Sequence, residues 1–379
     1  MYSVLEPVNI DFDFQEAKAF GYLGGQIAVH TSANQPELSQ YDMVLLGVKQ
    51  DGNAIDNEGA SHAPDAIRKS LYNLFPGQWK LRIVDAGNIK ISDDAEETYA
   101  NLLDFLQNIL PHQRLIVLGG TQDITHVLTK YFDLNNKAYN LSVMDCVIDG
   151  SILDSELDNE NFLTSILTND SSLLRNLSIL GVQTYYNHPS KYKIFDQMFV
   201  DYYKLGDVQA HLLDVEPELR DAQIVSVDVG SIRYADMPAQ VKAHPNGFTG
   251  KEICTLARYA GLSMLNKFFG IFEFNPFYDT KNVGEALIAQ MIWYYLEGAN
   301  TAQDDYPLLP KKELMKFYVQ NDLLKLVFYH NKKTGRWWVS LPEFDDGEQL
   351  YSCSESDYEA ATHMKVSKRI YQIINKSSL

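Results

Sequence analysis

The 379-residue sequence predicts an α/β fold, a three-layer α/β/α arrangement around a mainly parallel, doubly wound sheet. Short apolar runs rich in β-branched residues end in Gly, Asp or Asn, which is typical of strands covered on both faces. Helical patterns alternate with these runs, and this alternation favours a parallel sheet. The expected strands are 43–48, 81–85, 115–119, 141–145, 177–182, 224–228 and 269–275, and the expected helices are 64–74, 96–109, 250–266 and 284–298.

Two of the expected helices carry start signals. Pro64 suits a first helical turn, where its missing N–H leaves no hydrogen bond unmade. Thr249 and Glu252 have the spacing of a capping box, in which each side chain bonds the backbone N–H of the other residue. These signals support helices that begin near residues 64 and 250.

The end of the chain has a different composition. From Asp305 onward 11 basic and 10 acidic residues leave a net charge of +1, so residues 1–304 carry −19 and the whole chain −18. We therefore expect three segments: an N-terminal lead at 1–40, an α/β domain at 41–304 and a C-terminal extension at 305–379.

The extension reads as a β-hairpin followed by a helix. Residues 323–330 and 336–341 flank the turn NKKTG, in which Gly335 is expected at a positive φ. One amphipathic helix is expected at about 356–374. Trp337 and Trp338 are adjacent on a strand, so one ring should face the core and the other should face outward or toward a partner. A hairpin folded onto its own domain is the alternative.

Composition excludes several classes of protein. A net charge of −18 opposes binding to nucleic acid and to anionic membranes. No apolar stretch reaches the ~18 residues that a membrane-spanning helix needs, and the N-terminus does not read as a secretory signal. Three widely spaced cysteines, Cys146, Cys254 and Cys353, do not form a disulfide framework. We expect a cytoplasmic protein whose partner is an unknown protein or further copies of itself.

Polar residues follow three of the expected strands. Gln122 comes after LIVLGG, Asp145 and Asp149 come after LSVM, and Asp228 ends IVSVD. Carboxyl ends of parallel strands meet at one edge of a sheet, where ligands bind. These three acids and one amide therefore predict a polar site, although Asp is also a common turn and cap residue.

The segments LGGTQD, MDCVID and SVDVGSIRYADMP resemble, in this order, the three metal-binding motifs of the ureohydrolases (arginase, agmatinase and formimidoylglutamase). GASHAPDAIRKSLYNL, HPNGFTGKEICTLARYAG and GIFEFNP extend the resemblance over about residues 40–300, and the formimidoylglutamase-like branch is the most similar. The resemblance implies an arginase-like domain at 41–304. It also implies chemistry with two Mn²⁺ ions that share a bridging hydroxide.

The ligand motifs depart from the family pattern at several positions. The histidine of the first motif falls on Gln122, and both ligands that belong to the second ion alone fall on Val147 and Gly230. The resemblance thus implies a second site that is lost.

The first site keeps oxygen ligands only. They are Asp145, Asp149, Asp228 and the Gln122 carbonyl, a set that suits a hard cation. We expect no resident cofactor, with a single Mn²⁺, Mg²⁺ or Ca²⁺ ion as the alternative. Without an ion, a cation of the chain, Arg68 or Arg233, could fill the space between the carboxylates.

Three further residues are candidates for a place near this site. Glu273 matches a family glutamate that contacts the guanidino group of the substrate, or it is a strand-end acid with a solvent or backbone partner. Cys146 is expected to point into the core. His126 lies four residues after Gln122 and is expected to be a satisfied histidine rather than a ligand.

These observations lead to two hypotheses of function. The first is a catalytically degenerate ureohydrolase homologue, inactive by the dimanganese mechanism, that acts as a binding, scaffold or regulatory protein. The alternative is an active metal-dependent hydrolase of a C–N bond in a guanidino, amidino or N-formimidoyl amino-acid substrate.

Overall fold

The computed structural model describes residues 2–150, 156–198, 200–320, 325–341 and 349–377. Its strands are β1 Leu5–Glu6, β2 Ala28–Val29, β3 Met43–Gly47, β4 Ile83–Ile89, β5 Arg114–Leu118, β6 Tyr139–Met144, β7 Leu174–Val182, β8 Asp201–Lys204, β9 Ile224–Asp228, β10 Phe268–Phe272, β11 Met315–Gln320, β12 Lys325–His330, β13 Trp337–Ser340 and β14 Tyr351–Cys353. Its helices are α1 Phe14–Phe20, α2 Ala63–Tyr72, α3 Ala95–Gln107, α4 Ile124–Leu134, α5 Phe162–Leu167, α6 Pro189–Gln197, α7 Leu205–Ala210, α8 Glu216–Asp221, α9 Gly250–Leu262, α10 Val283–Thr301, α12 Glu355–Thr362 and α13 Lys368–Ser377.

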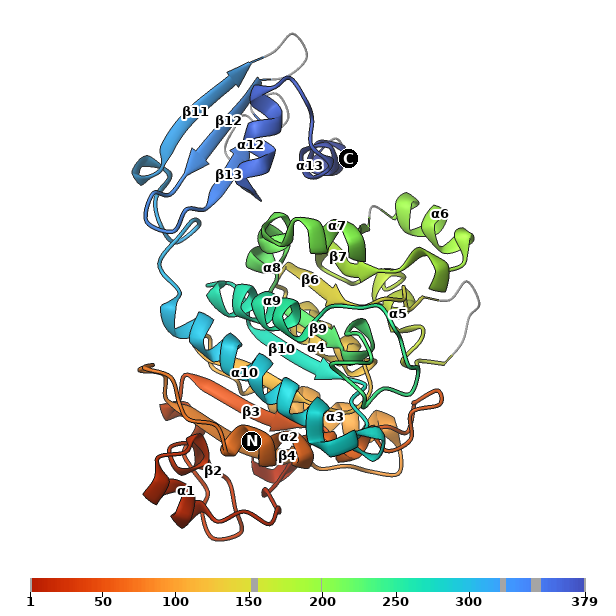
Figure 1. Cartoon of the computed structure of the whole chain (residues 1–379), viewed down its shortest axis with the longest axis vertical. Coiled ribbons are helices and arrows are strands. Elements are labelled where there is room, and N and C mark those ends of the chain that lie inside the picture. The colour runs from red at the N-terminus through yellow and green to blue at the C-terminus, as the bar shows by residue number, and fades with distance from the viewer. Residues whose placement is uncertain (1, 151–155, 199, 321–324, 342–348, 378–379) are drawn as a thin grey trace.

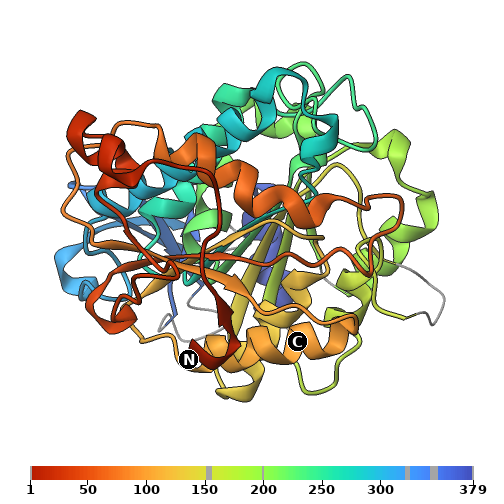
Figure 2. The same cartoon turned by 90° about the horizontal axis from the view of Figure 1, so that it is seen from below.

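The large sheet has the order β1-β4-β3-β5-β10-β9-β6-β7-β8, with β2 paired to β4 (Figure 1). All its pairings are parallel except that between β1 and β4. Helices cover both faces of this sheet (Figure 2). The predicted three-layer α/β/α fold is therefore confirmed, and each of the seven predicted strands has a counterpart.

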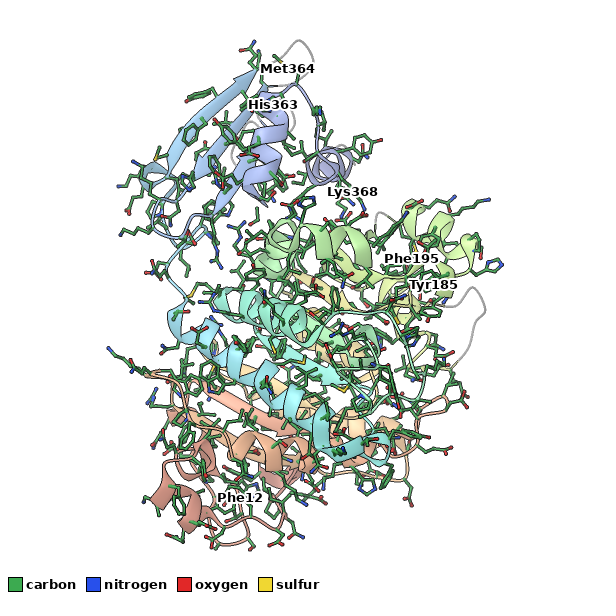
Figure 3. The ribbon with its side chains drawn as sticks, viewed as in Figure 1. Phe12, Tyr185, Phe195, His363, Met364 and Lys368 are labelled. Atoms are coloured by element: carbon green, nitrogen blue, oxygen red, sulfur yellow. The ribbon has the colours of Figure 1, made fainter. Side chains whose placement is uncertain are left out.

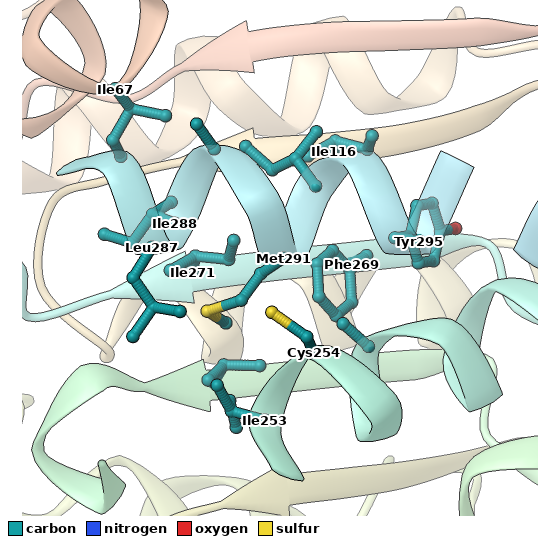
Figure 4. Close-up of a cluster of buried hydrophobic side chains, with 14 of the residues drawn as sticks. Ile67, Ile116, Ile253, Cys254, Phe269, Ile271, Leu287, Ile288, Met291 and Tyr295 are labelled. Atoms are coloured by element: carbon teal, nitrogen blue, oxygen red, sulfur yellow. The ribbon is translucent and has the colours of Figure 1, made fainter. Parts of the chain in front are cut away.

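The layers are held by two apolar cores, one on each face of the sheet. Helices α2, α9 and α10 pack on one face, and α3, α4 and α5 pack on the other. In the first core Met291 and Tyr295 of α10 meet Cys254 of α9 and Phe269 of β10 (Figure 4). The Phe269 and Tyr295 rings stack with centroids 4.5 Å apart. The capping box of Thr249 and Glu252 at the start of α9 is present as predicted.

A buried ion pair joins α2 to β4. The Arg68 guanidinium, with no exposed surface, donates from Nε and Nη2 to Asp85 at 2.8 and 2.9 Å and from Nη1 to Asn88 at 2.7 Å. Tyr72 adds a hydrogen bond of 2.8 Å to Asp85. The Arg68 guanidinium is thus fully engaged with residues of β4. The expectation that it could fill the space between the three carboxylates is wrong.

The C-terminal extension forms a four-stranded antiparallel sheet, β11-β12-β13-β14, rather than a hairpin alone. Gly335 has φ +72° in the turn between β12 and β13, as predicted. The single final helix that we expected is wrong: α12 and α13 are separate, because Met364 has φ +60°, a left-handed conformation that no helix continues through.

Both tryptophans of β13 are buried, with 6% of Trp337 and 1% of Trp338 exposed. Trp337 stacks on Tyr358 within the core of the extension. Trp338 lies under the guanidinium of Arg220 from α8, 4.7 Å from the ring centroid. The second ring therefore faces the α/β domain of the same chain.

Helix α13 also contacts the α/β domain. Lys368, labelled in Figure 3, donates to the carbonyl of Tyr202 at 2.6 Å and lies over the Tyr203 ring. Arg369 pairs with Glu218, and Lys376 donates to Asp201 at 2.5 Å. Within the part of the chain that the structure describes, no helix is long and apolar enough to cross a membrane.

We expect Arg68→Ala to lower the free energy of unfolding by about 3–5 kcal/mol, because it leaves Asp85 buried and unpaired. Arg82→Ala is the matched control: its pair with Asp42 at 2.8 Å is exposed and screened by solvent, so its loss should cost much less than the loss of Arg68. Urea unfolding followed by circular dichroism measures both. Equal losses in the two variants would contradict the role given to Arg68.

Candidate active site

The candidate site lies where four neighbouring parallel strands end. Strands β5, β10, β9 and β6 are adjacent in the sheet, so the residues after them reach one edge. A cavity of about 370 Å³ opens at this edge. It is lined by residues that follow these strands, among them Val147, Asp149, Asp228, Gly230 and Glu273.

Three carboxylates converge here, as the sequence predicted. One oxygen from each of Asp145, Asp149 and Asp228 lies within 4.8 Å of the others. The turn after each strand fixes these side chains, since Val147 N–H donates to Asp145 at 2.8 Å and Gly230 N–H donates to Asp228 at 2.6 Å. The carboxyls of Asp145 and Asp149 also interact with each other, which raises the pKa of Asp145 and lowers that of Asp149 against the effect of burial.

Burial and mutual repulsion make the charged forms unfavourable. Burial raises the pKa of Asp228 to about 7, and the charge of Asp149 adds to the rise. Burial also raises the pKa of Asp149 to about 6, against the hydrogen bond from Asp145 and the nearby charge of Lys191. The pKa of Asp145 is raised by burial and then by the charges of its two neighbours. A cation between them would remove this penalty.

Gln122 turns its carbonyl oxygen away from all donors. Its backbone N–H donates to Glu273 at 2.7 Å, and its side-chain Nε2 donates to Ser226 at 3.1 Å. The buried Oε1 of Gln122 and the buried Oδ2 of Asp145 both lack a hydrogen-bond partner among the described residues. Buried oxygens without donors are unusual and call for a partner such as a water or an ion. The three carboxylates fit a hard divalent cation.

No arginine, lysine or histidine of the described residues forms an ion pair with these three carboxylates. Arg233 pairs with Asp236 at 2.9 Å, so the expectation that it could fill the site is wrong. Lys191 and Lys242 line the cavity, but Lys191 donates to the carbonyl of Ile148 and Lys242 pairs with Glu160, each at 2.7 Å.

Glu273 stands on the wall of the same cavity, just after β10. Its φ of +65° turns the chain sharply, and Asn57 Nδ2 donates to both its backbone carbonyl at 3.2 Å and its carboxylate at 2.7 Å. Asn159 adds a contact of 3.3 Å. Burial, followed by the charge of Asp228, raises the pKa of Glu273 to about 8. Its carboxylate is held rigidly by the chain while it faces the cavity.

Val147 and Gly230 lie on the cavity wall between these acids. A Cβ atom at Gly230 would stand 3.1 Å from Asp228 Oδ1, so a side chain at position 230 would be directed at that carboxylate. Neither residue offers a side-chain ligand atom.

His126 has 9% of its surface exposed and is not among the residues that line the cavity, so it does not lie at the candidate site. The expectation that it is a satisfied histidine is wrong, because its buried Nδ1 has no hydrogen-bond partner among the described residues. Cys146 differs from its prediction because it lines the cavity wall, where its Sγ lies 3.9 Å from His244 Nε2.

His244 and the two asparagines that hold Glu273 were not predicted from the sequence as residues of this site. These residues come from loops distant in sequence, and no spacing pattern links them to the acids.

The comparisons with known proteins agree on one family. Residues 41–297 match the model of the arginase family. A formimidoylglutamase from Cupriavidus pinatubonensis is 26% identical over 275 residues, which cover 67% of this chain and 86% of that protein. Another, from Halalkalibacterium halodurans, is 26% identical over 278 residues, with the same two coverages.

Solved structures agree in fold. The Trypanosoma cruzi formiminoglutamase with Mn²⁺ has a TM-score of 0.65 at 19% identity and covers 72% of this chain and 97% of its own. Bacillus subtilis formimidoylglutamase has a TM-score of 0.63 at 18% identity, over 69% and 87% of the two chains.

Two expectations are not supported by these findings. The expectation of a catalytically degenerate binding, scaffold or regulatory protein is wrong, because the matching relatives are named as formimidoylglutamases and a structure of the same fold contains Mn²⁺. The expectation of no cofactor is not supported, since three aspartates converge in an arrangement that could hold a metal ion. The first expectation rested on the motif residues lost at Gln122, Val147 and Gly230, although the three aspartates predicted from the sequence do converge.

The raised pKa values predict an unusual pH dependence for the metal-free protein. In the unfolded chain the aspartates titrate near about 4, so between about pH 4 and 7 the folded state holds more protons. Its stability therefore falls as the pH rises through this window. Asp228→Asn removes one repelling charge, and we expect the variant to gain about 1–3 kcal/mol relative to the parent between pH 5 and pH 8.

Urea unfolding in EDTA at the two pH values measures this difference. Asp236→Asn is the control, because hydrogen bonds from Arg233 and Gly250 outweigh burial and lower the pKa of Asp236. Its carboxylate stabilises the fold above its unfolded pKa, so this variant should show no gain at pH 8. A pH-independent difference for Asp228→Asn would contradict the repulsion.

Proposed function

We propose that this chain, which belongs to the arginase family, is a metal-dependent hydrolase of a C–N bond in an amidino, guanidino or N-formimidoyl amino acid. The observation that carries the proposal is the meeting of Asp145, Asp149 and Asp228 in a cavity whose wall presents the fixed carboxylate of Glu273. An N-formimidoyl amino acid is the first candidate, because the matching relatives are named formimidoylglutamase.

One divalent cation, Mn²⁺ or Mg²⁺, would be held by these three aspartates and the Gln122 carbonyl. When bound, such a cation supplies Lewis acidity, lowers the pKa of water and neutralises developing negative charge. The buried oxygens of Gln122 and Asp145 that lack donors support this assignment. A single ion is favoured because Val147 and Gly230 supply no ligand atoms for a second.

Glu273 would orient the substrate. Its Oε1 accepts one backbone hydrogen bond, from Gln122, which leaves acceptor capacity toward the cavity. An amidine or formimidoyl group presents N–H donors and positive charge, which suit a carboxylate held by Asn57 and Asn159. The substrate's charge would favour the ionised form of Glu273.

The two lysines of the cavity suit the other end of the substrate. Lys191 and Lys242 lie on its wall, and a carboxylate of an amino-acid substrate would meet their positive charge. An amine substrate without a carboxylate lacks this attraction. The cavity therefore favours substrates that combine an amidine-like group with an acid.

The hydrolase proposal predicts Mn²⁺-dependent release of formamide from N-formimidoyl-L-glutamate. We expect Asp149→Asn to lower kcat/KM by at least about 100-fold through loss of the cation, and Glu273→Gln to lower it by about 10-fold or more through loss of substrate orientation. Asp133→Asn, on α4 outside the cavity, should keep the parent activity.

Product analysis by NMR with and without Mn²⁺ measures these rates. The panel includes arginine, agmatine and guanidinobutyrate. No formamide, urea or ammonia from any of these compounds, from a folded protein that binds Mn²⁺, would sink the proposal.

The single-ion assignment predicts that a second Mn²⁺ can be restored. The double variant Val147→His with Gly230→Asp places side-chain ligands at the two positions where the resemblance puts those of the second ion. Because a side chain at position 230 would be directed at Asp228, its carboxylate should be stable only with a cation present. We expect Mn²⁺ bound per chain, by elemental analysis after desalting, to rise from one to two. A parent protein that already holds two Mn²⁺ ions would refute the single-ion assignment.

A further inference from the structure

Outside the candidate site, the surface of the α/β domain and the N-terminal lead carries a cluster of aromatic side chains. Phe20 and Phe75 are each 63% exposed, and Tyr294 is 40% exposed. Three less exposed rings join them into one aromatic patch, whose members are Phe20, Tyr22, Phe75, Trp79, Trp293 and Tyr294. None of these six residues lines the candidate cavity.

Contacts between the rings make the aromatic patch continuous. Tyr22 lies between Phe20 and Phe75, with ring centroids 6.1 and 4.9 Å away. Trp293 lies beside Trp79, with centroids 5.5 Å apart. Trp293 Nε1 also donates to the backbone carbonyl of Phe75 at 2.8 Å, which joins the two groups of rings.

The backbone fixes the three segments that carry the patch. Leu23 N–H donates to the Leu74 carbonyl at 2.7 Å, which ties the segment after α1 to the loop 73–82. Asn300 Oδ1 accepts a hydrogen bond of 2.8 Å from Lys80 N–H, which ties the same loop to α10. An aromatic surface that is already ordered loses little conformational freedom on binding, and this favours association.

The patch is large enough to form the centre of a protein interface. With ~200 Å² for a whole aromatic side chain, the three most exposed rings alone present roughly 300 Å² of apolar surface. The largest apolar patch of a monomeric protein has about this size and is often functional. A standard interface buries about 800 Å² per partner around a core enriched in Trp, Tyr and Phe. The patch therefore has the composition and size of such a core, which the polar residues around it would complete.

The segments that carry the patch are close to neutral on an acidic molecule. Residues 286–296 of α10 contain no charged residue, and α1 contains one acid and one base. The loop 73–82 contains no acid and two bases, of which Arg82 is paired. Glu297, the next residue of α10, pairs with Arg258 at 2.5 Å. The chain as a whole has a net charge of −18, so its acidic charge lies outside these segments.

We propose that the aromatic patch is a two-fold interface through which two copies of this chain form a dimer. A nearly neutral apolar surface can face its own image across a two-fold axis, whereas the acidic surface elsewhere repels a second copy. A basic partner would instead be attracted to that acidic surface. The inference does not depend on hydrolase activity, because the patch lies outside the candidate cavity.

Sedimentation velocity and light scattering of the full chain, from submicromolar to submillimolar concentration, measure the dimer directly. We expect the parent chain to pass from monomer to dimer within this range. Phe75→Glu and Tyr294→Glu each put a carboxylate into the interface from both copies. We therefore expect each variant to raise the dissociation constant of the dimer by about tenfold or more.

Leu134→Glu is the matched control. Leu134 is 65% exposed at the end of α4, and α4 packs on the opposite face of the sheet from α10. This variant adds the same charge outside the patch and should change the dissociation constant by less than about twofold. Circular dichroism checks the fold of each variant, and a misfolded one is replaced by Phe75→Ser or Tyr294→Ser, which remove the ring without adding charge.

A parent chain that stays monomeric over the whole range would overturn the inference, whatever else the patch binds. Self-association that is unchanged in both Phe75→Glu and Tyr294→Glu would also overturn it, because the contact would then lie elsewhere. Equal weakening by Leu134→Glu would show that added charge alone is responsible and would reject the patch. None of these results depends on metal binding or catalysis, so the inference and the proposed function fail separately.

Discussion

Repulsion among Asp145, Asp149 and Asp228 is the constraint on which the rest of the site depends. Parallel strands β6 and β9 are adjacent, so Asp145 and Asp228 leave the sheet at the same edge, and the turn after Asp145 brings Asp149 beside them. Burial makes three unpaired carboxylate charges at this edge of the sheet energetically unfavourable. These carboxyls must therefore either bind protons or share a cation. Asp145 Oδ2 has no hydrogen-bond partner among the described residues and is available to such a cation.

The site lies at the edge of the sheet where the resemblance places it, but its candidate ligands differ in chemistry from those of the family motifs. Gln122 offers a carbonyl oxygen where the resemblance places an imidazole, while a thiol and an imidazole stand elsewhere on the wall, at Cys146 and His244. Oxygen ligands suit hard cations, so the residues that remain at this edge favour ions such as Mg²⁺ and Mn²⁺.

The sequence alone predicted the layers, the seven main strands and the cluster of acids, because apolar strands and strand-end polar residues have a local signature. It missed the short edge strands β1, β2 and β8, which form only through pairing with the large sheet. It also missed His244, since a loop residue reaches the cavity through tertiary contacts alone. The functional expectation was wrong because it rested on the motif residues lost at Gln122, Val147 and Gly230, although the three aspartates of the first site remain.

The most direct test of the account is the position of a bound ion. A crystal grown or soaked with Mn²⁺ and measured near the manganese absorption edge reveals the ion by its anomalous signal. The account predicts one strong peak in contact with carboxylate oxygens of Asp145, Asp149 and Asp228 and with the Gln122 carbonyl. An empty cluster in a crystal that contains Mn²⁺, or a peak only at other residues, would contradict it.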